Sequence, residues 1–172
     1  MPAHSPSPQP YYLTPAGRAR LRQRIEETRA AYQAVCASNE EAAGAGDSSV
    51  WHDNFAYEEN QRQMHQLARR VRTLESVLVE ARDVLPRTRP PMQVEIGAAV
   101  RVRRLADGRE SVWYVAGWDD GDPDRGRISY TAPLASALMG AEAGEIRTVR
   151  EGHRTVELEV VELLPAPASE LA

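Results

Sequence analysis

The residues best suited to chemistry lie in one short stretch, 46–60, which reads GDSSVWHDNFAYEEN and contains four acids and no basic residue except His52. Two of the acids, Asp47 and Asp53, flank a run of small and aromatic residues. Carboxylate oxygens are the ligands that Mg²⁺ prefers, although two acids alone do not complete its octahedral shell. A cation and a bound water delivered beside a second metal can hydrolyse a phosphodiester. The alternative is structural: Asp53 caps a helix and Asp47 forms a turn.

Two long helices are expected to position this stretch. Thr14 and Pro15 form a good helix start, and Gly44 and Gly46 a stop. A second helix is expected from Asp53 or Asn54 to the residues before Pro86. Both segments carry an apolar repeat of seven residues, which is typical of helices wound on one another. The repeat consists of Leu21, Ile25, Thr28, Tyr32, Val35, Asn39 and Ala42 in the first helix, and of Met64, Leu67, Val71, Leu74, Leu78 and Ala81 in the second. The short loop between them predicts an antiparallel hairpin. The apolar repeats of the two helices would then pack on each other within one chain, so a monomer is expected.

Charge is unevenly distributed along this hairpin. Residues 14–29 and 69–85 hold nine arginines against five acids, whereas residues 30–68 hold one arginine against six acids. Two solvated helices with uneven charge would explain each cluster alone. The gradient toward an acidic tip favours a functional polarity.

The second half of the chain has a different character. Residues 86–93 are rich in proline and predict a linker, after which the apolar period becomes two, as in strands. We expect an α+β protein: a disordered tail at 1–10, a coiled-coil hairpin at 11–85, the linker at 86–93, a small antiparallel sheet with one short helix at 94–165, and a tail at 166–172. The aspartate-rich loop 119–126 lacks the closing glutamate of a calcium loop, so calcium binding is not expected.

Composition excludes several other classes. No run of about 18 apolar residues exists, and the N-terminus lacks the basic and apolar pattern of a secretory leader. The single cysteine forms no internal disulfide, and the four histidines are scattered. A cytoplasmic location and no membrane partner are the expectation. All 21 basic residues are arginine, and the net charge of −4 argues against bulk attraction to nucleic acid.

Two motifs resemble the Gre-factor family of bacterial transcription elongation factors, over roughly residues 11–164. The first is the tip, with Gly46-Asp47, Asp53-Asn54 and Tyr57. The second comprises Ile128-Ser129, Pro133-Leu134, Leu138-Met139-Gly140 and Gly144-Glu145. The tip departs from the family pattern: five residues separate the two acids where the family has two, and Asp53 stands where the family has glutamate.

The resemblance implies a coiled coil followed by a domain of FKBP-like fold. It implies an accessory factor rather than an enzyme: the globular domain binds bacterial RNA polymerase, and the coiled coil enters the secondary channel. The tip acids Asp47 and Asp53 would then share Mg²⁺ of the polymerase active site, with no other cofactor. Implied tip contacts are Trp51, His52, Asn54, Phe55 and Tyr57. A basic patch facing nascent RNA would be Arg18, Arg22, Arg69, Arg70 and Arg72. The implied polymerase-binding residues are Ser129, Pro133, Leu134, Leu138 and Gly140.

The same residues are compatible with more than one function. The widened tip suits either a factor that stimulates cleavage of backtracked RNA or a relative that occupies the channel and inhibits. A coiled-coil adaptor would need no tip chemistry. A peptidyl-prolyl isomerase would need an aromatic pocket, whereas strand alternation scatters Trp113, Tyr114, Trp118 and Tyr130.

Overall fold

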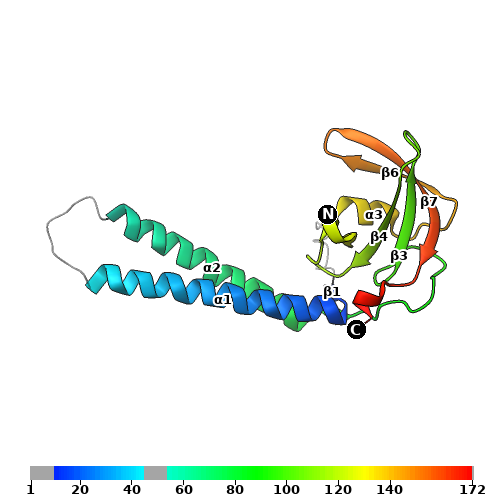
Figure 1. Cartoon of the computed structure of the whole chain (residues 1–172). Helices are drawn as coiled ribbons and strands as arrows, with labels where there is room; N and C mark the ends of the chain where they lie inside the picture. The colour runs from blue at the N-terminus through cyan, green and yellow to red at the C-terminus, as the bar shows by residue number, and fades with distance from the viewer. Residues whose placement is uncertain (1–9, 45–53, 172) are drawn as a thin grey trace, which may run out of the picture. The chain divides into compact units, whose positions relative to one another are not determined.

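The computed structural model describes residues 10–44 and 54–171 and contains two compact units (Figure 1). One unit, here called the helical unit, is Leu21–Glu80. The other, the globular unit, combines the residues up to Arg20 with those from Ala81 onward. The sequence suggested a boundary at the proline-rich segment 86–93. Those residues belong to the globular unit, where the amide of Arg87 donates to the carbonyl of Gly97 at 2.6 Å.

Helices α1 (Pro15–Gly44) and α2 (Asn54–Glu80) form the predicted hairpin. The burial pattern follows the heptad repeat, since each described side chain of the predicted seam from Leu21 to Leu78 is buried or half-buried. Leu21, Ile25 and Leu74 are nearly inaccessible to solvent. Val77, which the repeat did not include, is also buried. None of the described helices is apolar enough over a sufficient length to cross a membrane.

The start of α1 lies in the globular unit and matches the prediction. Thr14 is fully buried, and its hydroxyl accepts a hydrogen bond from the amide of Gly17 at 3.1 Å. This bond satisfies one of the donors that a helix leaves unpaired in its first turn. Just before the cap, β1 (Tyr12–Leu13) pairs in parallel with β2 (Arg82–Asp83), a pairing that the sequence did not predict.

The globular unit is built on a five-stranded sheet in the order β5-β4-β3-β7-β6. The strands are β3 (Ala99–Arg104), β4 (Glu110–Ala116), β5 (Arg127–Ser129), β6 (Ile146–Glu151) and β7 (Arg154–Leu164). The predicted sheet was purely antiparallel, but β5 pairs with β4 in parallel. The reason is the loop 117–126, which includes the short helix η1 (Pro123–Arg125) and returns the chain to the level of Tyr114 instead of reversing it as a hairpin. The first strand also begins later than its alternation suggested, because Gly97 takes a left-handed turn with φ of 88°.

The core of the globular unit lies between one face of the sheet and helix α3 (Pro133–Leu138). Valines of β3, β4 and β7 meet Ala135 and Leu138 there. The opposite face carries a smaller cluster, in which Ala99, Tyr114 and Ala116 pack with Ala166. The predicted α+β architecture, a helical hairpin plus a sheet with one short helix, is thus confirmed.

The sequence predicted only a tail at 166–172, but the described residues 166–171 are structured. They form the short helix η2 (Ala168–Glu170), in which Glu170 is only 4% exposed. Burial of this acid is possible because its carboxylate accepts hydrogen bonds from Arg20 and Arg127.

Candidate functional site

The predicted tip acids fall in the connection between the two helices. Asp47, Trp51, His52 and Asp53 lie outside the described residues. Asn54, Phe55 and Tyr57 belong to the first turns of α2. Helix α1 thus ends two residues before Gly46, and α2 begins directly after Asp53. By their position in the sequence, both acids therefore belong to the connection between α1 and α2. Elsewhere, across 10–44 and 54–171, no group of three or more acid, histidine or cysteine side chains has the arrangement of a metal site.

The predicted basic patch separates into residues with different surroundings. Arg18 lies in the globular unit, where its guanidinium donates to Asp83 at 2.8 Å and to the carbonyl of Ala81 at 3.1 Å. Arg22 lies in the helical unit and lines a groove with Ile25 and Val79. Arg18 therefore already serves the fold and offers less of its charge to a ligand than an exposed arginine would.

Arg69 and Arg72 lie on a common face of α2. With Arg62 and His65 they line a shallow hollow of about 330 Å³. The four residues follow one another at spacings of three, four and three, which places them on one side of a helix. Arg70 does not line this hollow. The sequence prediction named Arg69 and Arg72 but missed Arg62 and His65, although their helical spacing would have identified them. We call Arg62, His65, Arg69 and Arg72 the basic stripe.

The predicted polymerase-binding residues surround α3. Pro133 is its exposed first residue, and the half-buried Leu134 packs against the core. Leu138 is fully buried, and Gly140 ends the helix with φ of 74° while its amide donates to the carbonyl of Val94. Leu138 and Gly140 therefore shape this segment, and Pro133 and Leu134 are its accessible part.

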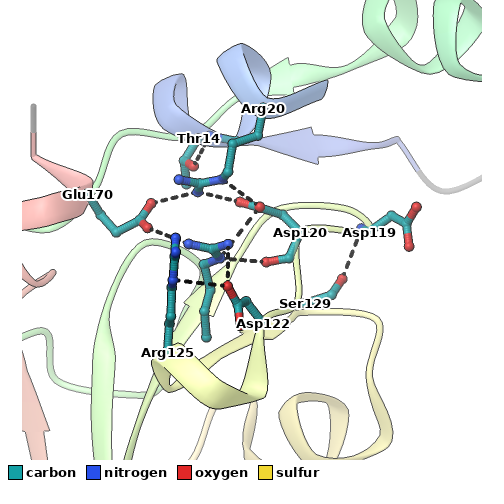
Figure 2. A network of polar contacts seen from close by, with 10 residues as sticks. Thr14, Arg20, Asp119, Asp120, Asp122, Arg125, Ser129 and Glu170 are labelled. Atoms are coloured by element: carbon teal, nitrogen blue, oxygen red, sulfur yellow. Dashed lines mark hydrogen bonds and ion pairs between the residues drawn. The ribbon is translucent and has the colours of Figure 1, made fainter. Parts of the chain in front are cut away.

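Ser129 is also buried and organises the loop in front of α3. Its hydroxyl accepts a hydrogen bond from the amide of Asp119 at 3.2 Å (Figure 2). The same hydroxyl lies 2.9 Å from the hydroxyl of Thr131. Asp119 has φ of 51°, a left-handed conformation that costs energy for any residue other than glycine. The hydrogen bond that the Asp119 amide donates to Ser129 helps to hold the backbone in that conformation.

The sequence did not reveal a buried network of ion pairs in the globular unit (Figure 2). Arg20 donates to both carboxylate oxygens of Asp120, at 2.7 and 2.6 Å, and to Glu170 at 2.8 Å. Arg127 donates to the carbonyl of Asp120 at 3.0 Å and to Glu170 at 3.1 Å, and it pairs with Asp122 at 3.5 Å. Burial alone would lower the pKa of Arg20, but the hydrogen bonds to Asp120 and Glu170 outweigh it and raise the pKa above its usual value.

Tyr114 lies next to this network and is 3% exposed. Burial raises the pKa of Tyr114 to about 12, and the negative charge of Glu170 contributes to the rise. The phenol is therefore neutral at every physiological pH. The network and Tyr114 together join the first turn of α1, the loop 117–126 and the C-terminal residues into one polar joint, which has the character of a structural joint rather than a catalytic centre.

The four aromatic residues that a prolyl isomerase pocket would need do not come together. Trp113 alone lines a hollow of about 280 Å³ with Leu134 and Leu158. Tyr114 belongs to the cluster on the opposite face of the sheet. Trp118 makes an edge contact with Tyr11, and Tyr130 makes one with Tyr12. The described residues therefore contain no aromatic pocket of the kind that the prolyl isomerase hypothesis requires.

Comparison with known proteins connects both units to one family. The family model described as "Transcription elongation factor, N-terminal" matches residues 11–82, and that described as "Transcription elongation factor, GreA/GreB, C-term" matches residues 89–165. The GreA transcription elongation factor of Roseiflexus sp. (strain RS-1) is 32% identical, over 91% of this chain and 99% of the relative. The GreB factor of Neisseria meningitidis serogroup A is 34% identical, over 89% of this chain and 94% of the relative.

Among solved structures, the GreA factor homolog 1 protein of Thermus thermophilus aligns with a TM-score of 0.41 and 22% identity, over 90% of this chain and 99% of that chain. The family matches cover the helical hairpin and the sheet with its short helix, and they include both motifs on which the resemblance was based. The chain belongs to the GreA/GreB family of transcription elongation factors.

Proposed function

We propose that this chain binds bacterial RNA polymerase through its globular unit and inserts its hairpin into the secondary channel, where it stimulates the polymerase to cleave backtracked RNA. Family membership over nearly the whole chain supports a role in transcript elongation. The observation that supports the finer proposal is that α1 ends at Gly44 and α2 begins at Asn54, so that Asp47 and Asp53 lie in the sequence between the two helices. The chain would act as a monomer in the cytoplasm, as an accessory factor to an active site that the polymerase supplies.

The donor set at the tip fits this role. Asp47 and Asp53 offer carboxylate oxygens, which suit Mg²⁺, and two ligands leave room for the polymerase to complete the shell. Mg²⁺ shared in this way supplies charge neutralisation and a more acidic bound water. The protein's contribution is to carry the two carboxylates there and to hold them in place. Asn54, at the start of α2, and the aromatic residues Trp51, Phe55 and Tyr57 would make the surrounding contacts, together with His52.

Two further surfaces have parts in this proposal. The segment from Ser129 to Gly140 would contact polymerase, with Pro133 and Leu134 exposed or half-exposed to a partner. The basic stripe on α2 would face the phosphates of nascent RNA, because arginines at helical spacing present several positive charges along one side. Arg22 and Arg70 of the predicted patch lie outside the basic stripe and would contribute less to phosphate binding. Arg18 would contribute least, because it already pairs with Asp83.

A second function is favoured by one specific feature. Five residues separate the two tip acids, and metal ligation tolerates displacements of only about 0.5 Å. A tip that misplaces one acid would still fill the channel. The chain would then inhibit elongation by occupancy, without cleavage.

A backtracked elongation complex with RNA labelled at its 5′ end and the cognate polymerase tests both functions. With Mg²⁺ and the wild-type factor, the proposal expects shortened RNA and resumed elongation. Asp47→Ala with Asp53→Ala should abolish the shortening while polymerase binding is retained. Glu58→Gln, near the tip but outside the proposed ligand pair, is the matched control and should remain active.

Other results would distinguish cleavage stimulation from inhibition by occupancy and from an adaptor role. Binding without cleavage, accompanied by reduced run-off product, would establish the occluding inhibitor. Failure of the wild-type chain to bind the polymerase at all would overturn the proposal and leave an adaptor role.

A further inference from the structure

The last residues of the chain form a strap on the globular unit. The C-terminal family model ends at residue 165, whereas the structure places residues 166–171 in definite contacts. The amide of Ala166 donates to the carbonyl of Arg87 at 2.7 Å, and its side chain packs with Ala99, Tyr114 and Ala116. Helix η2 then brings Glu170 to the buried network. We call residues 166–171 the C-terminal strap.

Glu170 joins two arginines that come from distant parts of the sequence. Its Oε2 lies 2.8 Å from Nη2 of Arg20, and its Oε1 lies 3.1 Å from Nη1 of Arg127 (Figure 2). Each carboxylate oxygen thus binds a different guanidinium. Arg20 belongs to the first turns of α1, and Arg127 opens β5.

The burial of its arginines makes the strap important to this joint. Arg20 and Arg127 both pair with Asp120 and with Glu170, and Arg127 also pairs with Asp122. Removal of Glu170 takes one carboxylate partner from each arginine. The side chain of Arg127 is only 12% exposed, so water cannot fully replace the lost carboxylate. A buried charge that loses a partner is strongly destabilised.

The joint also controls the loop before the proposed polymerase-binding segment. Arg127 holds the carbonyl of Asp120, and the neighbouring residue Asp119 donates its amide to Ser129. Loss of Glu170 would therefore loosen two places in the globular unit: the first turns of α1 through Arg20, and the loop 117–126 through Arg127.

We propose that the C-terminal strap is a positioning element beyond the residues that the family model matches, in which Glu170 holds the first turns of α1 and the loop 117–126 in register. Glu170 acts through Arg20 and Arg127 and contacts no substrate. Removal of a solvated tail would leave the first turns of α1 and the loop 117–126 unchanged, whereas removal of the strap should loosen both. This role of Glu170 belongs to the isolated protein and does not depend on the proposed function.

Hydrogen–deuterium exchange on the full-length protein tests the strap. Glu170→Gln keeps the size of the side chain and removes its charge. We expect amide exchange to rise by about tenfold or more in residues 14–20 and 117–129, while the hairpin residues 24–36 and 60–76 exchange as in the wild type. Truncation after Pro165 should have the same or a larger effect in the same two segments. Leu171→Ala, which changes an exposed neighbour in the strap, is the matched control.

Thermal unfolding tests the pairing of Glu170 with Arg20. Glu170→Gln should lower Tm by about 4–8 °C. Arg20→Gln and the double variant complete a cycle, in which the effects of the two changes must be non-additive because they remove the same contact. Glu170→Asp, which retains the charge, should recover part of the lost Tm.

Unchanged exchange at 14–20 and 117–129 in Glu170→Gln would overturn the proposal. Strictly additive effects of Glu170→Gln and Arg20→Gln would overturn it as well. If the truncated chain fails to fold, the Glu170→Gln exchange pattern decides the question alone.

Discussion

A β-carbon on Gly17 would lie 2.9 Å from Oδ2 of Asp120 and 3.0 Å from the hydroxyl of Thr14. Glycine at this position in the first turn of α1 therefore has a steric reason. It lets the Asp120 carboxylate approach the N-terminus of the helix, where the helix dipole favours a negative charge. The same carboxylate is then in place to receive both hydrogen bonds from Arg20.

Gly17→Ala should destabilise the protein, although the same change in an exposed helix stabilises by about 1 kcal/mol. The added methyl group must displace Asp120 or Thr14, both of which are buried and hydrogen-bonded. We expect a net loss of about 1–3 kcal/mol, as for overpacking in a core, measured by urea unfolding. Ala19→Gly, at an exposed site in the same helix, should cost about 1 kcal/mol by propensity alone. A more stable Gly17→Ala variant would contradict the close approach.

Gly117→Ala should be more damaging than Gly121→Ala. A β-carbon on Gly117 would lie 2.8 Å from the carbonyl oxygen of Tyr12 and 3.0 Å from the α-carbon of Leu13, and backbone atoms cannot rotate away. The same atom on Gly121 would find its nearest neighbour at 3.5 Å, an ordinary contact. We expect Gly117→Ala to cost about 1–3 kcal/mol and Gly121→Ala to stay within about 0.5 kcal/mol of the wild type. Equal unfolding midpoints for the two variants would contradict the packing of β1 beside the end of β4.

Tyr114 predicts a loss of stability at high pH. Its pKa is raised to about 12 in the folded protein, against about 10 in an unfolded chain. The folded state therefore retains the phenolic proton longer, so this contribution is complete below pH 10 and is lost as pH rises from 10 through 12. A shift of two units corresponds to roughly 3 kcal/mol. From pH 9 to pH 12, the unfolding free energy should fall in both proteins. The fall should be smaller in Tyr114→Phe than in the wild type, by about this amount. Tyr12→Phe is the control, and an identical pH dependence in Tyr114→Phe would contradict the prediction.

The basic stripe predicts a salt effect that rests on the proposed function. Arg69→Gln with Arg72→Gln should weaken binding to a backtracked elongation complex and make it less sensitive to salt. If each arginine meets one phosphate of single-stranded RNA, the slope of log K against log salt concentration should fall in magnitude by about 1.4. Arg87→Gln, an exposed arginine of the globular unit that pairs with Glu95, should leave the slope unchanged. A parallel displacement of the whole curve would mean that the stripe does not meet phosphates.

The hairpin was predictable because its information is local and periodic. The heptad positions of both helices fixed their lengths and buried faces, and Thr14 with Pro15 fixed the start of α1. Val77 was missed because the strict repeat assigned only Leu74 and Leu78 to the seam near it. The basic stripe was half predicted, since charge clustering drew attention to Arg69 and Arg72 before their helical spacing to Arg62 and His65 was considered.

The polar joint could not be predicted, because its partners are far apart in the sequence. Arg20 meets Asp120 across 100 residues and Glu170 across 150. Before the fold is known, an arginine in a basic helix and an acid near the chain end both look solvated. Only the sheet, with its parallel fifth strand, brings Asp120 and Arg127 to the same place. The structure of the tail likewise could not be predicted, because its composition gives no sign that Glu170 binds Arg20 and Arg127.

The separation of these partners has a consequence for the order in which the protein is made. A chain leaves the ribosome from its N-terminus and begins to fold during synthesis. The heptad contacts of α1 and α2 are complete once residue 80 has emerged. The first turns of α1 gain their contact with Asp120 only after residue 120 has emerged, and their contact with Glu170 later still. The hairpin can therefore form during synthesis well before the polar joint does, and a chain that stopped before Glu170 would keep the hairpin but lack the carboxylate that pairs with Arg20 and Arg127.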